Sequence, residues 1–303
     1  MAIIEVRHLL KTYGSIKAVN DVSFEVHEGE IFGMVGPNGA GKTTTIECIE
    51  GLRKPDAGEV HVLGLDPQRE GRILRERIGI QLQESELQDH IRVKEAIRLF
   101  SSFYKSPIRE ESLLEKLGLT GIQNAYYGNL SGGQKKRLFI ALALVGDPEI
   151  VFLDELTTGL DPQGRRVMWD LVRSIREEGK TVVMTTHYME DAERLCDRVA
   201  IIDHGRIVAL NRPEILIQRL GAEKKVVFTV ANLFKPEPLQ TLPGVTRIKQ
   251  NGERIIVWGK GDDLLPNIVK IAEKQGWKLK NLRLMQPTLE DVYLSITGRE
   301  MHD

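Results

Sequence analysis

Short runs of continuous apolar residues recur along roughly the first 220 residues, and segments with helical periodicity separate them. Runs of this kind, rich in β-branched and aliphatic side chains, are typical of strands that are buried on both faces of a parallel sheet. Two earlier segments, 4–14 and 17–30, alternate in character instead and indicate an antiparallel flank. The pattern therefore predicts an α/β fold. Its expected parallel strands span residues 31–36, 150–154, 181–187 and 198–203.

Strand patterns are absent between residues 84 and 146, where the apolar positions follow helical spacing. We expect helices over 93–104 and 111–119, and a third helix that follows Ser131. That third helix is apolar all round by residues 138–145, so its end should be buried. The region 84–146 is therefore predicted to be a helical subdomain inserted in the sheet.

The composition changes near residue 221, where a second pattern of strands and helices begins. It predicts a helix over 264–277 and a last helix over 288–296, with strands at 224–230, 244–250, 253–259 and 278–285. We therefore predict two domains, residues 1–220 and residues 221–303, of which the second is a small, accessory α/β domain that supports dimer formation.

The formal net charge of −1 provides no long-range attraction to nucleic acid or anionic lipid. The most apolar stretch, 138–146, is far shorter than the roughly 20 residues that span a bilayer. The chain has two widely separated cysteines, Cys48 and Cys196, which favour reduced, buried thiols in a cytoplasmic protein, with a disulfide or redox pair as the alternative. Any membrane association would therefore depend on contact with a partner.

A glycine-rich loop follows the strand predicted at 31–36 and precedes a helical segment. Residues 36–43, GPNGAGKT, fit the phosphate-binding pattern GxxxxGK[ST], in which backbone N–H groups and a helix N-terminus face the phosphates. Lys42 should reach the β- and γ-phosphates, and the Thr43 hydroxyl should bind Mg²⁺. The predicted nucleotide-binding residues here are Gly36, Pro37, Asn38, Gly39, Ala40, Gly41, Lys42, Thr43 and Thr44.

Two acidic residues, Asp154 and Glu155, end the strand predicted at 150–154. Such a pair is by itself more often a helix N-cap than a catalytic pair. Next to a phosphate loop, however, Asp154 can hold a Mg²⁺-bound water and Glu155 can act as general base toward the attacking water. We therefore predict Asp154 as a metal ligand and Glu155 as a catalytic residue.

A second anion-binding turn lies at residues 130–134, LSGGQ. A serine and two glycines at the start of a helix leave backbone N–H groups available for a phosphate. A chain with one phosphate loop does not obviously need a second cradle, and the simplest explanation is that it serves the nucleotide of another copy. The residues predicted for this role are Ser131, Gly132, Gly133 and Gln134. The basic residues 135–137 that follow could indicate nucleic-acid binding, but a solvated start of the helix is the favoured interpretation.

With these motifs in this order, the chain resembles an ATP-binding-cassette (ABC) ATPase subunit over about residues 3–220. The resemblance implies a P-loop ABC ATPase fold, ATP and Mg²⁺ as cofactors, and two subunits that face head-to-tail around two nucleotides. It also implies that Tyr13 stacks on adenine, unless it is a plain core aromatic, and that Asp161 contacts the second subunit. His187 resembles the switch histidine that contacts the γ-phosphate, and Gln83 the glutamine that senses Mg²⁺ and the partner, with Gln81 as the alternative.

The sequence departs from the family pattern at Leu156, where the family usually has proline after the catalytic glutamate. Since proline would fix the backbone there, the geometry around Glu155 should be looser or differently supported. The segment 287–298 is similar to the C-terminal segment of cassette subunits that serve ABC-2-type exporters, although an amphipathic closing helix would explain it too.

The leading hypothesis is an ATPase that pairs with a second copy of itself or with a related subunit, and that drives a separate integral membrane permease. It would lie in the cytoplasm, peripheral on the inner face of the cell membrane, and residues 83–104 would dock on the permease. The rival is a soluble ABC ATPase acting on ribosomes or DNA. The sequence has one cassette, no zinc cysteines and no basic surplus, so we expect no nucleic-acid partner. A GTPase or small-molecule kinase would leave LSGGQ unexplained.

Overall fold

The computed structural model describes residues 1–82, 85–219, 223–230 and 235–298. The chain divides into two compact units between Pro213 and Glu214. The division predicted at residue 220 differs from this point by a few residues and stays a prediction.

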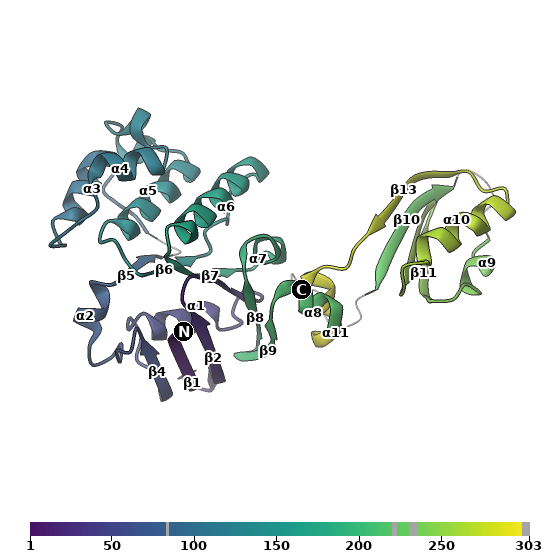
Figure 1. The fold of residues 1–303 in the computed structure, drawn as a ribbon, viewed down its shortest axis with the longest axis horizontal. Helices are drawn as coiled ribbons and strands as arrows, with labels where there is room; N and C mark the ends of the chain where they lie inside the picture. Colours follow the sequence, from purple (N-terminus) through teal and green to yellow (C-terminus); the bar gives the residue numbers. More distant parts are fainter. Residues whose placement is uncertain (83–84, 220–222, 231–234, 299–303) are drawn as a thin grey trace. The chain divides into compact units, whose positions relative to one another are not determined.

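The first unit is built on a six-stranded sheet in which five neighbouring strands run parallel and the edge strand β9 runs antiparallel to β8 (Figure 1). The predicted strands are found in it, and the central ones are buried along their whole length. The predicted parallel core is therefore confirmed. In spatial order the strands are β5 (Ile78–Gln81), β6 (Ile150–Asp154), β7 (Thr181–Thr186), β3 (Ile31–Val35), β8 (Arg198–Asp203) and β9 (Arg206–Asn211).

A three-stranded antiparallel sheet flanks this core, as the alternating segments predicted. It consists of β2 (Ile16–His27), β1 (Ala2–Tyr13) and β4 (Ala57–Val62). One hydrophobic cluster joins both sheets to helix α1 (Lys42–Ile49), and in it the rings of Phe24 and Phe32 stack with centroids 5.2 Å apart. The helix that follows the phosphate loop is thus fixed between two sheets.

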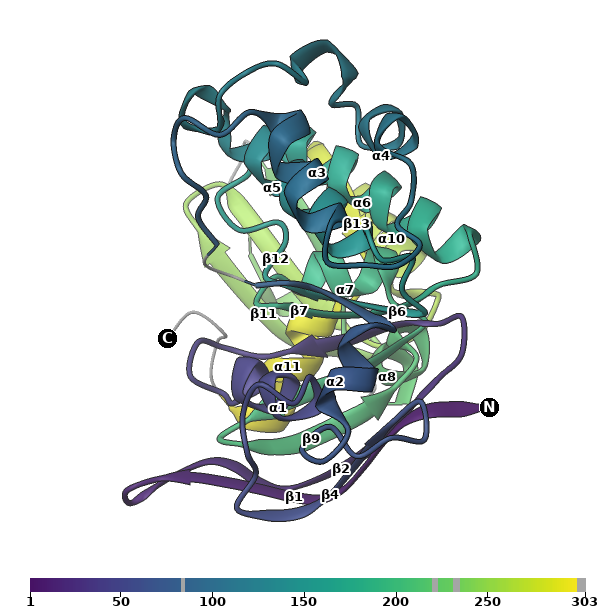
Figure 2. The same cartoon turned by 90° about the vertical axis from the view of Figure 1, so that its left-hand side faces the viewer.

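Helices cover the opposite face of the six-stranded sheet. Both views place α5 and α6 on one side of β6 and β7, and α1 on the other (Figures 1 and 2). Between residues 85 and 146, the described part contains helices and one isolated bridge between Arg92 and Tyr126. Besides α1, the helices described in this unit are α2 (Gly71–Arg75), α3 (Val93–Ser101), α4 (Glu110–Lys116), α5 (Gly132–Leu144), α6 (Pro162–Glu177) and α7 (Met189–Leu195), with 3-10 turns at Thr120–Ile122 and Tyr127–Asn129.

The second unit contains an antiparallel sheet whose strands and helices follow one another as β-α-β-β-α-β. Its core lies between the sheet and α10, with Phe228, Val257 and Ile268 fully buried. This is the small α/β unit that the fold class predicted. In spatial order the strands are β11 (Val245–Asn251), β12 (Arg254–Gly259), β10 (Lys224–Val230) and β13 (Leu279–Met285). The helices between them are α9 (Glu237–Gln240) and α10 (Leu264–Lys274); α8 (Pro213–Arg219), which begins at the division, precedes this pattern, and α11 (Leu289–Thr297) follows it.

Across the described ranges, every helix is too short or too polar to cross a lipid bilayer.

Candidate functional site

The glycine-rich loop connects the end of β3 to the start of α1 and is shaped by close backbone contacts. A Cβ atom at Gly36 would lie 2.2 Å from the carbonyl oxygen of Ile202, and one at Gly41 would lie 2.1 Å from that of Ala18. Gly41, which caps α1, also has a φ of 105°, in the region that favours glycine. The loop therefore requires glycine at these positions, and it brings backbone N–H groups together at the N-terminus of a helix.

Lys42 is folded back onto this loop. Its Nζ donates hydrogen bonds to the carbonyl oxygens of Gly36 (2.8 Å) and Pro37 (3.0 Å). Burial lowers the pKa of the lysine, while the nearby carboxylates of Glu155 and Asp154 raise it. The loop and its lysine thus form a positively polarised cradle. Of the other predicted loop residues, Ala40 is buried, Thr43 and Thr44 are half-buried, and Asn38 and Gly39 are exposed.

Asp154 lies at the end of β6, where it meets Thr43 from α1. The Thr43 side chain hydrogen-bonds to Asp154, and the Thr185 hydroxyl donates to Asp154 Oδ1. Burial raises the pKa of the aspartate, against the lowering effect of these hydrogen bonds and of Lys42. A hydroxyl and a carboxylate beside a phosphate cradle are oxygen ligands of the kind that Mg²⁺ prefers, so Thr43 and Asp154 fit this ion.

Glu155 occupies an unusual backbone position, with a φ of 48°. Its N–H donates to the carbonyl oxygen of Thr185 at 3.2 Å, and its Oε2 accepts from the Thr158 hydroxyl at 3.2 Å. The Nδ1 atom of His187, which follows β7, lies 3.3 Å from the same Oε2. Helix α6 begins only at Pro162 and is capped by Asp161, so neither acidic residue caps this helix. The alternative reading of the pair as a helix N-cap is thereby excluded.

Lys136 supports the backbone after Glu155, and the sequence analysis missed this role. Its Nζ donates to the carbonyl oxygens of Glu155 (3.1 Å) and Leu156 (2.6 Å), and burial lowers its pKa. Arg137 likewise donates to two carbonyl oxygens at the end of α4, each at 3.2 Å. Residues 135–137 are all half-buried, so the helix start is partly solvated, but Lys136 and Arg137 also bind backbone carbonyl oxygens. The turn that lacks the usual proline is supported by a lysine from α5.

The LSGGQ turn forms a capping box at the start of α5. The Ser131 N–H donates to Gln134 Oε1 at 2.8 Å, and the Gln134 N–H donates to Ser131 Oγ at 3.3 Å. A Cβ atom built at Gly132 would have no heavy atom within 4 Å, and its φ is not in the left-handed region. At Gly133 the nearest atom is Leu160 Cδ2, at 3.8 Å. Neither packing nor backbone conformation within this chain therefore requires glycine at position 132.

The remaining predicted residues lie at the edges of this arrangement. Tyr13, at the end of β1, is 42% exposed, which excludes the core-aromatic alternative, and the Arg53 guanidinium lies 5.4 Å from its ring centroid. Asp161 is exposed and accepts a hydrogen bond from the Gly164 N–H at 2.6 Å. Gln83 lies outside the described residues. Gln81 is buried at the end of β5 and donates to the Leu82 carbonyl oxygen at 2.5 Å.

Comparison with known proteins gives one consistent family. The ABC transporter family model matches residues 19–158, which include the phosphate loop, LSGGQ and both acidic residues. The chain is 39% identical to the Nod factor export ATP-binding protein I of Rhizobium etli over 311 residues, with 99% of this chain and 95% of the relative covered.

Two solved structures extend this likeness to the three-dimensional fold. A bacterial ABC transporter cassette, solved as a dimer, is 30% identical with a TM-score of 0.62, covering 69% of this chain and 98% of its own. A dimeric cassette in a post-hydrolysis state, bound to ADP and Pi, is 29% identical with the same TM-score and the same coverage. Together with the site geometry, these likenesses show that the chain belongs to the ABC transporter family, as one of its ATP-binding, ATP-hydrolysing subunits.

Proposed function

We propose that each molecule carries two half-sites, and that hydrolysis requires a second copy or a related subunit. The loop 36–43 of one subunit binds the nucleotide, and the LSGGQ turn of the other covers its γ-phosphate. The observation that carries this proposal is Gly132: it lies exposed at a helix N-terminus and no neighbour in its own chain needs it to be glycine. A phosphate that approaches the backbone N–H groups from another subunit would need that space.

Within the composite site, the residues of this chain have distinct tasks. Lys42 and the loop N–H groups bind the β- and γ-phosphates, and Tyr13 stacks on the adenine. Thr43 and Asp154, together with Gln83, would hold Mg²⁺, which would neutralise charge on the phosphate oxygens. Glu155 accepts the proton of the attacking water, and His187, 3.3 Å from it, contacts the γ-phosphate. Asp161, at the start of α6, contacts the second subunit.

We further propose that the subunit drives export through an integral membrane permease, on the cytoplasmic side of the membrane. Relatives that match almost the whole chain are named as export ATP-binding proteins. The segment 287–298 also resembles the C-terminal segment of ABC-2-type exporter subunits. The predicted docking surface includes Leu99 and Phe103, whose exposed fractions of 48% and 72% are large for apolar side chains. Large apolar side chains exposed to this extent suit contact with a protein partner.

The experiment is to isolate the tagged chain from gently solubilised membranes and to identify what remains bound. An integral membrane protein should co-purify, and Phe103→Glu should reduce its recovery without reducing ATP binding. The matched control is Lys105→Glu, at an exposed position nearby. Recovery of ribosomes or nucleic acid in place of a membrane protein would contradict the proposal.

A further inference from the structure

Asp191, in the first turn of α7, is a fully buried carboxylate with a complete set of donors. Its Oδ1 accepts from Arg165 Nη2 at 2.7 Å and from Trp169 Nε1 at 2.9 Å. Its Oδ2 accepts from the Thr186 hydroxyl at 3.0 Å and from the Thr157 hydroxyl. An ionised carboxylate offers about four lone-pair positions, so these donors occupy its whole acceptor capacity.

The four donors come from three segments, and each segment carries a residue of the proposed site. Thr157 lies two positions after Glu155, and Thr186 immediately precedes His187. Arg165 and Trp169 are on α6, which Asp161 caps. One side chain therefore connects the loop of the proposed general base, the loop of the switch histidine and the helix that carries the subunit-contact aspartate.

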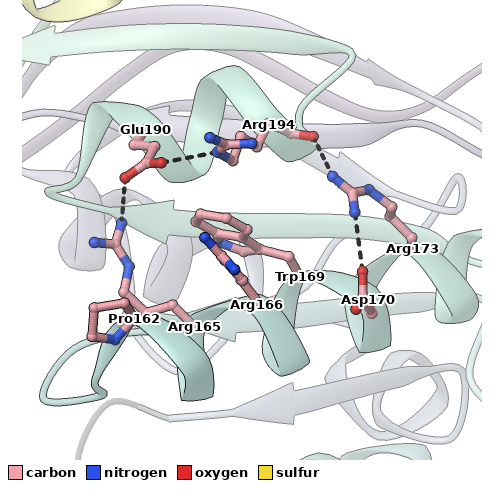
Figure 3. Close-up of a pocket in the computed structure, with 8 residues that line it drawn as sticks. All are labelled: Pro162, Arg165, Arg166, Trp169, Asp170, Arg173, Glu190 and Arg194. Carbon is pink, nitrogen blue, oxygen red and sulfur yellow. Dashed lines mark hydrogen bonds and ion pairs between the residues drawn. The ribbon is translucent and has the colours of Figure 1, made fainter.

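The surroundings of Arg165 restrain this connection further. The Arg165 guanidinium lies 4.6 Å from the ring centroid of Tyr188 and 5.5 Å from that of Trp169. Glu190 lies 3.8 Å from Arg165 and accepts a hydrogen bond from Arg194 Nε at 2.9 Å. These three side chains line a surface pocket of about 350 Å³ (Figure 3). Asp191 and Glu190 thus hold Arg165 between α6 and α7 from two sides.

We propose that Asp191 is a positioning residue for ATP hydrolysis. It ties the Glu155 loop to the His187 loop, so that their side chains keep the 3.3 Å separation. The carboxylate is suited to this because it accepts all four hydrogen bonds at once, whereas an amide would turn N–H groups toward donors and leave Arg165 without its buried counter-charge. The proposal rests on the catalytic roles proposed for Glu155 and His187.

The first test is Asp191→Asn in the whole chain, with kcat and KM for ATP measured separately. Because small displacements of reacting groups can cost ~10²-fold in rate, kcat should fall by about 10- to 100-fold. KM should stay within about 3-fold, since the phosphate loop and Lys42 are untouched. A fluorescent ATP analogue gives the fraction of molecules that bind nucleotide, and kcat is expressed per binding-competent molecule.

A matched pair at Thr157 keeps the proposal testable if Asp191→Asn does not fold. Thr157→Val removes the hydroxyl at nearly constant volume and should lower kcat, whereas Thr157→Ser keeps the donor and should restore most of it. Wild-type kcat for Asp191→Asn or for Thr157→Val, per binding-competent molecule, would overturn the positioning role. Glu155→Gln distinguishes failure of the base role of Glu155 from failure of the positioning role of Asp191. Wild-type turnover in Glu155→Gln would contradict the base role. Loss of turnover in Glu155→Gln, with normal turnover in the Asp191 and Thr157 variants, would contradict the positioning role alone.

Discussion

The Nδ1 atom of His187 lies 3.3 Å from the Oε2 atom of Glu155, although the two residues follow different strands. Because β6 and β7 pair in parallel, Glu155 and His187 both lie at the carboxyl ends of the strands. Asp154 lies at the same ends, where its side chain hydrogen-bonds to Thr43 at the end of the phosphate loop. The phosphate loop, the two acidic residues and the histidine therefore all come from the first compact unit of the chain.

Glu155→Gln should leave ATP binding intact and stop turnover. The amide keeps the size of the side chain but cannot accept a proton, and a general base is worth ~10²–10⁴ in rate. Because the bound ATP would not be hydrolysed, the dimer that encloses two nucleotides should accumulate. Light scattering after gel filtration with Mg-ATP would detect it, and phosphate release would report turnover. Glu177→Gln, at an exposed position at the end of α6, is the control and should behave as the wild type. Normal turnover in Glu155→Gln would remove this residue from the base role.

Lys136→Met should lower both stability and kcat. The change removes the half-buried donor that holds the carbonyl oxygens of Glu155 and Leu156, and loss of such hydrogen bonds costs about 1–3 kcal/mol. With the turn loosened, Glu155 would sample unproductive positions, so kcat should fall more than nucleotide affinity. Urea unfolding and steady-state kinetics measure the two effects. Lys105→Met, an exposed lysine, should change neither. Unaltered kcat in Lys136→Met would show that the turn is held by other contacts.

Glu50 should make stability depend on pH. It is 2% exposed, and burial, with Asp154 and Glu47 nearby, raises its pKa from 4.5 to about 8. The folded chain thus keeps a proton that the unfolded chain releases in this interval, so the free energy of unfolding falls as pH rises from 4.5 to about 8.

Glu50→Gln removes this loss of stability at higher pH, because the amide is neutral at every pH. We expect the variant to be more stable than the wild type by ~1 kcal/mol or more at about pH 8.5, with a smaller gain at about pH 5. Urea unfolding at both pH values provides the measurement. Glu59→Gln, exposed on β4, should show no such difference between the two conditions. A gain for Glu50→Gln that is equal at both would contradict the assignment.

Much of the cassette was predictable because its signals are local. Continuous apolar runs marked the buried strands, and the loop 36–43 carries its function in consecutive residues. The roles of Lys136 and Asp191 were not predictable, since both depend on partners far away in the sequence. In the sequence, Lys136 stands among basic residues that indicate a solvated helix start. Asp191 stands in a short polar segment, where an aspartate side chain is expected to be exposed. The folded chain buries Asp191 completely and Lys136 in part, and it brings their distant partners to them.

The sharing of one ATP between two subunits is the central claim, and mixing two inactive variants tests it directly. Lys42→Ala disables the phosphate loop, and Ser131→Arg blocks the LSGGQ turn, so each variant alone should be inactive. In a mixed dimer, one site combines the intact Lys42 of one subunit with the intact Ser131 of the other. Equal mixtures should therefore regain about a quarter of wild-type turnover, as random pairing of isologous dimers with independent sites implies. No recovery in mixtures shown to contain the mixed dimer, or undiminished turnover in either variant alone, would contradict the sharing of one ATP between two subunits.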